Sequence, residues 1–501
     1  MALTLHDFQM AMGEHVCQAA QERVEIRAIS YNSKEVVPGT LFFCKGNHFK
    51  PSYLKEALER GAVAYVAETD FGEDVPHILV DNMRHILAPC ARLFYGDPQK
   101  KLQLLAVTGT KGKSSTVWYL KSILSAYCKK HDLGPVGFLT SISNFDGGEE
   151  KTSTLTTPEP FELYAILARC VENGVRYVAF EVSSQALKVE RTAGLHFAMG
   201  AFLNISPDHI SSIEHPNFED YFQSKLRLFS QSDIAIININ SDHREEIEAA
   251  AAACKMIVRV GFSNQSDADV TATINDHHKG ISFTVQADGK SIPLHLPEIG
   301  DYAMQNAAVA VTMALEAGVP AEEIPGALES VHIPGRMEFL STGDGMIRSI
   351  IDFAHNGVSF SAVFEAAHRQ FPDCAMLTVF GSTGGKAVNR RADLGRVADT
   401  YADRIILTMD DPNAESLSSI YSDIEKSIRQ TPYETIDDRK AAIEKAMDYA
   451  KEYAKNGKKS MLLLLGRGNE TTMYVDGVAR PYGDDRSILT PLFTAYDKKT
   501  E

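Results

Sequence analysis

The sequence is poor in the residues that mark secreted or membrane-spanning chains. Only seven of its 501 residues are cysteine, and their scattered positions include no CxxC pair. This usage indicates a reduced chain and argues against a disulfide framework or a zinc site. The N-terminal stretch MALTLHDFQM has no basic segment followed by an apolar one, so we expect no signal peptide. The hydrophobic runs are only as long as strands, and we therefore expect no membrane insertion.

Positive charge is also scarce. The chain has 50 Lys and Arg against 66 Asp and Glu, which gives a net charge of −16. Sequence-independent nucleic-acid binding needs a basic surface, so the charge argues against a nucleic-acid partner. With 44% hydrophobic residues and a mean hydropathy of −0.16, the chain can bury ample core. We expect a cytoplasmic monomer that acts on small molecules, with about three domains of roughly 150 residues each.

One stretch carries a specific chemical signal. Leu104–Val107 is an apolar run of strand length, and the segment TGTKGKSS at 108–115 follows it before a helical pattern begins. Strand, glycine loop, Lys-Ser and helix form a phosphate-binding P-loop, although Val107 stands where the full motif has its first glycine. An ordinary glycine-rich turn is the alternative. The P-loop interpretation predicts ATP or a related nucleotide bound by Gly109, Thr110, Lys111, Gly112, Lys113, Ser114 and Ser115.

Apolar runs alternate with helical patterns through most of the chain, which favours α/β domains with doubly wound, mostly parallel sheets. We expect an N-terminal domain at 1–101, a central P-loop domain at 102–333 and a Rossmann-like C-terminal domain at 334–501. A hairpin with a turn at Asp288-Gly289 interrupts the alternation. Strands are expected at 40–44, 62–67, 177–183, 201–206, 234–240, 347–355, 376–382, 404–410 and 460–466, and helices at 52–60, 306–317 and 438–455.

Polar residues follow several of these strands. Glu181 ends one run and is either a Mg²⁺ ligand or a surface carboxylate. His209, in the segment NISPDH, is a metal ligand or, more often for such a residue, a structural histidine. Lys225 lies on an amphipathic helix and, taken alone, is interpreted as a solvated lysine.

The C-terminal domain has a second group of strand ends. Arg336 could clamp a phosphate and Asp352 could accept a ribose hydroxyl. Asp410 and Asp411 suit a ligand that carries an ammonium group, although the Asp-Asp-Pro segment taken alone favours a turn or a helix cap. Since the carboxyl ends of parallel strands meet at one edge, we expect these loops to converge with the loop that begins at Gly466.

Taken together, these stretches resemble the Mur ligase family, whose members form amide bonds with ATP in bacterial cell-wall synthesis. The resemblance covers essentially the whole chain and is greatest with the MurE-type branch, which adds the third amino acid of the peptide. The motifs that carry it are GTKGKS, LTTP at 155–158, EVSSQAL with Arg191, NISPDH, the pair Tyr221-Phe222 with Lys225, Asn306, PGRME, DFAHN, GSTGGK with NRR, DDPN, and Asp438-Arg439 with Ala442-Ile443.

The resemblance implies a mechanism through an acyl phosphate. The D-glutamate side-chain carboxylate of UDP-MurNAc-L-Ala-D-Glu would attack the ATP γ-phosphate, and an incoming amine would then displace phosphate. Lys113 and Arg336 would stabilise the transferring group. For Lys225 and His209 the resemblance implies functional roles, in place of the solvated lysine and the structural histidine that each residue alone suggests. It implies that Lys225 is carbamylated to N6-carboxylysine and that two Mg²⁺ ions bind, one held by Ser114 and Glu181 and the other by His209.

The resemblance also assigns the remaining contacts. Asn306 would contact the adenine and Asp352 the ribose. The muramoyl-dipeptide would be held by Thr156, Thr157, Ser183 and Arg191, and its uridine end by Ser33, Gly46, Asn47 and His48. The incoming amino acid would meet Asp410, Asp411, Asn413, Gly466 and Glu470.

One position bears on which amino acid is added. Members that use meso-diaminopimelate carry Arg in the fourth place of an Asp-Asn-Pro-Arg motif, and Asn413 occupies that place here. Loss of this carboxylate partner favours a side chain that ends in an amine alone, hence L-lysine, with ornithine or diaminopimelate still open. Two further hypotheses compete with this function: a paralogue with another acceptor, such as folylpolyglutamate synthase, and a nucleotide-binding sensor without ligase activity.

Overall fold

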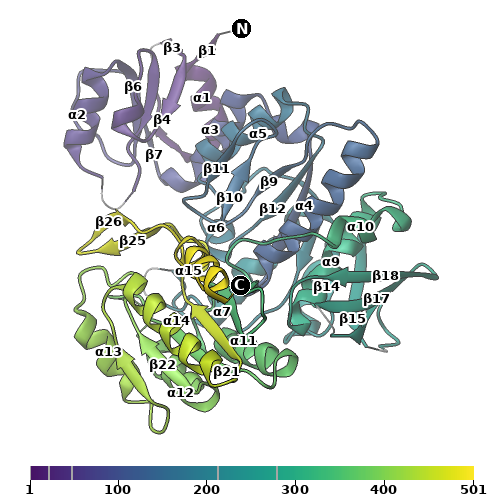
Figure 1. Ribbon diagram of the computed structural model, residues 1–501. Coiled ribbons are helices and arrows are strands. Elements are labelled where there is room, and N and C mark those ends of the chain that lie inside the picture. The colour runs from purple at the N-terminus through teal and green to yellow at the C-terminus, as the bar shows by residue number, and fades with distance from the viewer. Residues whose placement is uncertain are drawn as a thin grey trace. The chain divides into compact units, whose positions relative to one another are not determined.

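The computed structural model describes residues 2–20, 23–46, 49–211, 214–263, 265–277, 280–386 and 388–500. Packing divides them into two compact units. The first takes in the described residues up to Thr271 together with Asn306–Ile324, and the second takes in 272–305 and the described residues from Pro325 on. Both units are α/β, as the alternating pattern predicts (Figure 1). The division into three domains near residues 101 and 333 stays a prediction.

The first unit begins with a five-stranded sheet in the order β2-β7-β6-β5-β4. Its inner strands β5, β6 and β7 are parallel and nearly continuous in apolar residues, because helices cover both faces. The strands are β2 (Val16–Gln18), β4 (Ala28–Ser30), β5 (Thr40–Phe43), β6 (Ala62–Ala67) and β7 (His77–Val80). The helices are α1 (Leu5–Met12) and α3 (Met83–Tyr95) on one face and α2 (Pro51–Glu59) on the other.

A larger sheet positions the P-loop. Strand β8 (Gln103–Thr108) lies between β12 (Tyr177–Glu181) and β13 (Phe197–Phe202), and all three are parallel. The chain leaves β8 for β9 on one side of it and leaves β13 for β14 on the other side. The direction of the connections therefore reverses between β8 and β13, where such sheets bind ligands beyond their carboxyl ends. Further strands are β9 (Gly137–Leu139), β10 (Ser143–Phe145) and β11 (Glu150–Thr152) beyond β12, and β14 (Ser232–Asn238) and β15 (Met256–Phe262) beyond β13.

The helices of this part bury apolar faces against the sheet. In α4 (Lys113–Lys130), Val117, Leu120 and Leu124 recur at helical spacing and are fully buried. The other helices are α5 (Pro160–Glu172), α6 (Ser184–Lys188), α7 (Phe218–Leu226), α8 (Arg244–Ala251) and α9 (Asp301–Glu316).

The second unit contains a sheet in the order β19-β20-β24-β21-β22-β23, parallel except for β19. Helices α11 (Gly357–Gln370), α12 (Arg390–Tyr401) and α13 (Leu417–Glu425) cover one face, and α14 (Arg439–Lys455) and α15 (Asp485–Thr500) cover the other (Figure 1). The strands are β19 (Glu338–Ser341), β20 (Ile347–Asp352), β21 (Ala375–Phe380), β22 (Arg404–Leu407), β23 (Tyr433–Thr435) and β24 (Ser460–Leu465).

Two hairpins complete this unit. The predicted one is confirmed as β17 (Ile281–Ala287) and β18 (Lys290–Leu296), with Asp288 and Gly289 both at positive φ in the turn. A second, β25 (Thr472–Val475) and β26 (Val478–Pro481), was not expected from the sequence.

Several predicted strands are too long at their carboxyl ends. The run 201–206 is wrong by four residues, since β13 spans Phe197–Phe202, and the runs 347–355 and 404–410 end at Asp352 and Leu407. In each case the chain leaves the sheet and its polar side chains bind loop backbone instead. Asn204 and Asp352, for example, accept hydrogen bonds from Lys111 N and Ala354 N.

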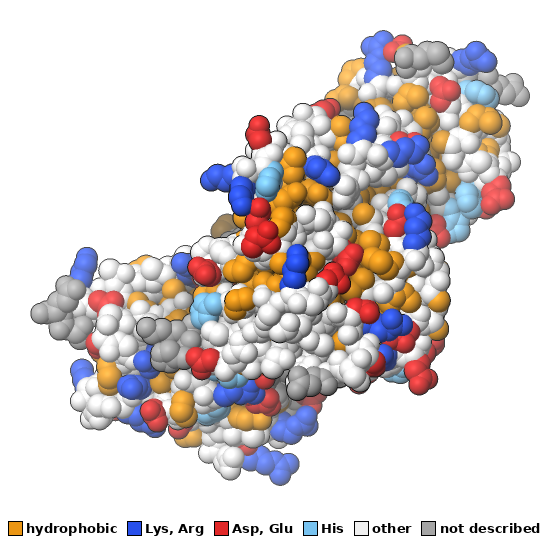
Figure 2. All heavy atoms as spheres, turned by 90° about the vertical axis from the view of Figure 1, so that its right-hand side faces the viewer, with side chains coloured by type: hydrophobic (Ala, Val, Ile, Leu, Met, Phe, Trp, Pro, Cys, Tyr) orange, Lys and Arg blue, Asp and Glu red, His pale blue; other side chains and the backbone are white. Residues whose placement is uncertain are grey.

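Basic and acidic side chains intermingle over the face drawn in Figure 2. Of the helices in the described part of the chain, none has the length and apolar character that a membrane span requires.

A buried ion pair joins the last two helices to the sheet. Arg439 Nε and Nη2 donate to the two carboxylate oxygens of Asp485 at 2.9 and 2.7 Å, and Nη2 also donates to Leu465 O at 2.9 Å. Both side chains are fully buried. The Tyr482 hydroxyl donates to Asp485 at 2.7 Å, so the carboxylate has a full set of partners.

Removing one charge of this pair leaves the other buried without compensation. We expect Asp485→Asn to lower the free energy of unfolding by about 3–5 kcal/mol. The matched control is Asp448→Asn, which breaks the exposed Asp448–Lys451 pair on α14 and should change stability by less than about 0.5 kcal/mol. Denaturant unfolding of both variants measures the difference. Equal losses would contradict this account of the buried pair.

Candidate active site

The P-loop follows β8 directly and has the backbone conformation that phosphate binding needs. Gly109 and Gly112 have φ of +154° and +86°. At Gly112 a Cβ atom would lie 2.2 Å from Asn306 Oδ1, so only glycine lets the buried Asn306 side chain pack against the loop. This contact places Asn306 beside the predicted nucleotide site, and Ser115 lies in the first turn of α4.

The segment after β13 holds the loop in place. Thr110 N donates to Asn204 O at 3.0 Å, and Lys111 N donates to Asn204 Oδ1 at 2.9 Å. Asn204 Nδ2 in turn donates to Lys111 O at 3.1 Å. Asn204 therefore clamps both sides of the loop, which explains why the chain leaves the sheet before NISPDH.

Two lysines meet at one carbonyl oxygen. Lys113 Nζ and Lys225 Nζ each donate to Gly109 O at 2.9 Å. Lys225 is only 1% exposed, so its interpretation as a solvated helix lysine is wrong. Burial, and then the neighbouring Lys113, hold the pKa of Lys225 well below its usual range. A buried amine that loses its proton readily can act as a nucleophile.

Glu181 and Ser114 lie on either side of Ser141. The Ser114 hydroxyl is 3.1 Å from Ser141 Oγ, and Glu181 Oε1 accepts from Ser141 N at 3.0 Å. Glu181 is 1% exposed, so the alternative of a surface carboxylate is wrong. The Ser114 hydroxyl, in the first turn of α4, and the Glu181 carboxylate, at the end of β12, are the hard oxygen donors that Mg²⁺ prefers. The residues present therefore fit this ion.

His209 lies at the end of the segment that clamps the loop. It has a positive φ of 55°, its Nδ1 is 3.1 Å from Glu214 Oε1, and its ring is 6.0 Å from that of Tyr221. Lys225 Nζ lies 4.6 Å from the centre of the same Tyr221 ring. His209 and Lys225 therefore both lie near the Tyr221 ring, although they are not neighbours in the sequence.

A cationic cluster surrounds Glu159, two residues after the predicted Thr157. Lys45, Arg84 and Arg191 approach its carboxylate at 2.6, 2.8 and 2.9 Å. Arg191 also donates to Thr157 O at 3.0 Å, and the Thr157 hydroxyl accepts from Ser183 N at 3.1 Å. Glu162 also interacts with Lys45 and Glu159, so three cations face two carboxylates. The cluster keeps a net positive charge, which suits an anionic ligand.

A cavity of about 290 Å³ opens beside this cluster, lined among others by Leu155, Pro158 and Glu159. Thr156 lies within that same segment. The Ser33 hydroxyl donates to Glu56 at 2.7 Å, and Gly46 has a φ of +100°. Asn47 and His48, which the resemblance assigns to the uridine end, lie outside the described residues.

In the second unit, Arg336 stacks its guanidinium 4.5 Å from the Phe353 ring and donates to Gly335 O at 3.1 Å. Both carboxylate oxygens of Asp352 accept backbone hydrogen bonds, from Met337 N and Ala354 N at 2.7 Å each. Asp352 thereby positions the loop that carries Arg336.

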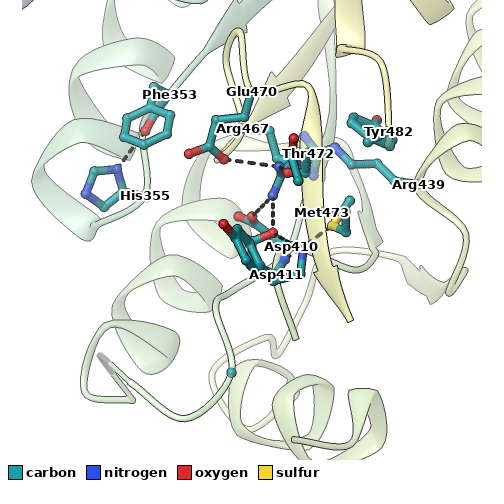
Figure 3. Close-up of polar contacts among 12 residues, drawn as sticks. Phe353, His355, Asp410, Asp411, Arg439, Arg467, Glu470, Thr472, Met473 and Tyr482 are labelled. Atoms are coloured by element: carbon teal, nitrogen blue, oxygen red, sulfur yellow. Dashed lines mark hydrogen bonds and ion pairs between the residues drawn. The ribbon is translucent and has the colours of Figure 1, made fainter. Parts of the chain in front are cut away.

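The predicted acidic group forms around a residue that the sequence analysis left without a role (Figure 3). Asp410, Asp411 and Glu470 have oxygens within 4.8 Å of one another. The fully buried Arg467 lies between them, with distances of 3.0 and 2.9 Å to the aspartates and 3.2 Å to Glu470. One guanidinium neutralises one of three carboxylates, so the ionised group retains negative charge that suits an ammonium ligand.

The neighbours of this group are equally constrained. A Cβ at Gly466 would lie 2.5 Å from Asp410 Oδ2, so this glycine makes room for the carboxylate. Asn413 has a φ of +53°, which asparagine tolerates, and its amide donates to Gly384 O at 3.2 Å and Asp411 O at 3.0 Å. Asn413 thus holds the loop of Asp411.

Sequence reasoning missed Arg467 and Glu159. In the sequence Arg467 belongs to none of the motifs that carry the resemblance, and its contact with Asp410 joins positions 57 residues apart. A buried arginine needs carboxylate partners. The sequence did place Arg467 directly after an apolar strand and an Asp-Asp pair after another strand. These two features together could have predicted the pairing.

A P-loop on a parallel sheet, together with a second α/β unit that carries a group of carboxylates, is typical of a nucleotide-dependent enzyme. Comparisons with known proteins agree. The model of the Mur ligase middle domain matches residues 107–314, and that of the Mur ligase glutamate ligase domain matches residues 335–468. The chain is 35% identical over 487 residues to a UDP-N-acetylmuramoyl-L-alanyl-D-glutamate–L-lysine ligase of Streptococcus pyogenes serotype M4, covering 97% of this chain and 96% of that protein.

Solved structures share the fold. A UDP-N-acetylmuramoyl-L-alanyl-D-glutamate–2,6-diaminopimelate ligase has a TM-score of 0.66 at 22% identity, with 99% of each chain covered. A Mycobacterium tuberculosis folylpolyglutamate synthase, solved with ADP and AMPPCP, has a TM-score of 0.62 at 16% identity, covering 75% of this chain and 91% of its own. The chain belongs to the Mur ligase family, and it is an ATP-dependent ligase that forms amide bonds.

The contact between Gly112 and Asn306 makes a direct test of the nucleotide site. We expect Gly112→Ala to weaken ADP binding at least about tenfold, because the new Cβ displaces the Asn306 side chain and strains a positive φ. Gly174→Ala is the matched control, since Gly174 also has a positive φ, of +72°, but open space around it. Titration calorimetry with ADP compares the two. Normal ADP affinity in Gly112→Ala would contradict the assignment.

Proposed function

We propose that this ligase joins L-lysine to the D-glutamate side-chain carboxylate of UDP-MurNAc-L-Ala-D-Glu, as a cytoplasmic monomer in peptidoglycan precursor synthesis. The observation that carries the proposal is the 35% identity, over nearly the full length of both chains, to a relative named for that reaction. The match to the folylpolyglutamate synthase covers 75% of this chain, whereas the match to the diaminopimelate ligase covers 99%. The larger coverage favours a muramoyl-peptide acceptor.

The first step is attack of the acceptor carboxylate on the ATP γ-phosphate. A P–O bond to ADP breaks, and an acyl phosphate forms. Lys113 and the P-loop N–H groups are proposed to bind the phosphates, Arg336 to stabilise the transferring group, Asn306 to contact the adenine and Asp352 to contact the ribose. Mg²⁺, held by Ser114, Glu181 and His209, would supply positive charge against the phosphate oxygens.

Lys225 is proposed to carry a carbamate. The ammonium form first loses one proton. The neutral amine nitrogen then bonds to the carbon of CO₂ and releases a second proton, which leaves an anionic carbamate. The depressed pKa of Lys225 supports this, because the reaction requires the neutral amine. The change would also relieve the crowding of two lysine amines at Gly109 O.

The acceptor is proposed to bind at the cationic cluster, with Thr156, Thr157, Ser183 and Arg191 on the dipeptide and Ser33 and Gly46 toward the uridine end. The excess positive charge around Glu159 supports an anionic ligand there. The amine of lysine then attacks the acyl phosphate, the C–O bond to phosphate breaks, and the amine gives up a proton.

The ammonium end of the amino acid is proposed to bind at Asp410, Asp411 and Glu470, beside Gly466. Asn413 is uncharged, and its amide already donates to backbone oxygens. It therefore offers no cationic partner to a second carboxylate of the amino acid. This favours L-lysine over meso-diaminopimelate.

Phosphate release with ATP, Mg²⁺ and UDP-MurNAc-L-Ala-D-Glu tests the proposal. We expect release with L-lysine and at least about 100-fold lower kcat/KM with meso-diaminopimelate, because the latter's distal carboxylate would meet an acidic group. Ornithine tests the length of the side chain. Equal use of diaminopimelate would overturn the specificity, and no release with any of the three would move the activity to another acceptor.

The acidic group also predicts a pH dependence. Partial burial, and then the two aspartates, raise the pKa of Glu470 to about 7 against the lowering effect of Arg467. Glu470 is therefore protonated below this pH and gains its charge above it. We expect the Kd of L-lysine to fall severalfold between about pH 6 and pH 8, measured by calorimetry. Glu470→Gln is the control and should bind weakly with a flat profile. A flat profile in the unmodified protein would contradict the role of Glu470.

A further inference from the structure

A buried histidine outside the groups assigned above lies at the centre of a hydrogen-bonded chain. His215 is fully buried. Its Nε2 is 3.0 Å from Ser184 Oγ, and its Nδ1 is 2.8 Å from Asp220 Oδ2. An ionised carboxylate only accepts, so Nδ1 carries the proton, and the neutral ring accepts the Ser184 hydroxyl hydrogen at Nε2.

The same segment is tied to the far end of α6. Lys188, the last residue of that helix, donates to Asp220 Oδ2 at 2.7 Å and to Glu214 O at 2.9 Å. Ser184 is the first residue of α6. Both ends of this short helix are therefore fastened to the segment that includes Glu214, His215 and Asp220.

The hydrogen bonds of His215 with Ser184 and Asp220, together with those of Lys188, form a clamp between α6 and α7. Both helices belong to proposed parts of the active site. Helix α6 follows Ser183 directly and ends shortly before Arg191, the two proposed acceptor contacts. Asp220 lies in the first turn of α7, which also carries Lys225. Tyr221, next to Asp220, contacts the His215 ring edge-on at 5.2 Å and donates its hydroxyl to Thr110 of the P-loop at 3.0 Å.

The order serine, histidine, carboxylate is also that of a nucleophilic triad, but the surroundings argue for another role. Ser184 is only 5% exposed, so its hydroxyl is closed to a substrate carbonyl. Asp220 is shared with Lys188, and this divides its charge between the ring and a helix end. The arrangement joins two helices and leaves no nucleophile free.

We propose that His215 is a positioning residue, which holds the acceptor-binding helix α6 in register with Lys225 and the P-loop through Ser184 and Asp220. The carboxylate of the acceptor must lie in line with the γ-phosphate, and misplacement by about 1 Å can cost about 100-fold in rate. The inference rests on the proposed function for its kinetic part, since it assumes the acceptor named there.

The variants separate the two arms of the clamp. Ser184→Ala removes the hydroxyl and keeps the ring. His215→Gln can still place an amide oxygen near Ser184 but loses the donor to Asp220, and His215→Asn keeps that donor and loses the reach to Ser184. Ser232→Ala is the matched control, because Ser232 is a similarly buried serine that donates to Leu228 O at 2.8 Å, away from this clamp.

Steady-state kinetics give the first measurement. We expect Ser184→Ala and both His215 variants to raise the KM of UDP-MurNAc-L-Ala-D-Glu and lower kcat, together by about 10- to 100-fold in kcat/KM, with the KM of ATP unchanged. Ser232→Ala should match the unmodified protein. Unchanged kinetics in the clamp variants, or equal losses for ATP and acceptor, would overturn the inference.

Hydrogen exchange gives a second measurement that does not depend on the substrate. We expect faster exchange in 183–191 and in the first turn of α7 when Ser184 or His215 is changed, and no such effect in Ser232→Ala. Exchange as in the unmodified protein would overturn the clamp even if the enzyme used another acceptor. Changed exchange without turnover of this acceptor by the unmodified protein would instead count against the proposed function alone.

Discussion

The first unit depends on the carbonyl oxygen of Gly109, which receives hydrogen bonds from both Lys113 and Lys225. Two lysine side chains converge there because β8 ends between β12 and β13, where the direction of the connections reverses. Asn204 clamps the loop. Burial and the neighbouring Lys113 together hold the pKa of Lys225 well below its usual range, which is the condition that its proposed carbamylation requires.

The two units concentrate opposite charges. Although the chain has a net charge of −16, the first unit gathers Lys45, Arg84 and Arg191 at one place, beside a cavity. The second gathers three carboxylates around Arg467 (Figure 3). The proposed ligand sites use this difference, with an anionic acceptor at the first group and the ammonium end of the amino acid at the second.

Much of the fold was open to prediction because its signals are local. The P-loop, the Asp288-Gly289 hairpin and the long helix predicted at 438–455 follow from spacing and turn chemistry, and all are present. Strand ends were less predictable. Asn204 and Asp352 continue apolar runs in sequence, yet their side chains bind loop backbone. For the site, the family motifs named the residues, but their partners Arg467, Glu159 and His215 come from distant segments.

The sequence by itself determined the α/β class, the phosphate loop and the likeness to the Mur ligases, because each is written in contiguous residues. Only the tertiary structure decided the environment of the charged side chains. It buries Lys225 and Glu181, fills the acidic group with Arg467 and encloses His215 between two helices. The reason is physical: burial and pairing depend on contacts between segments far apart in the chain, and these set charge and pKa.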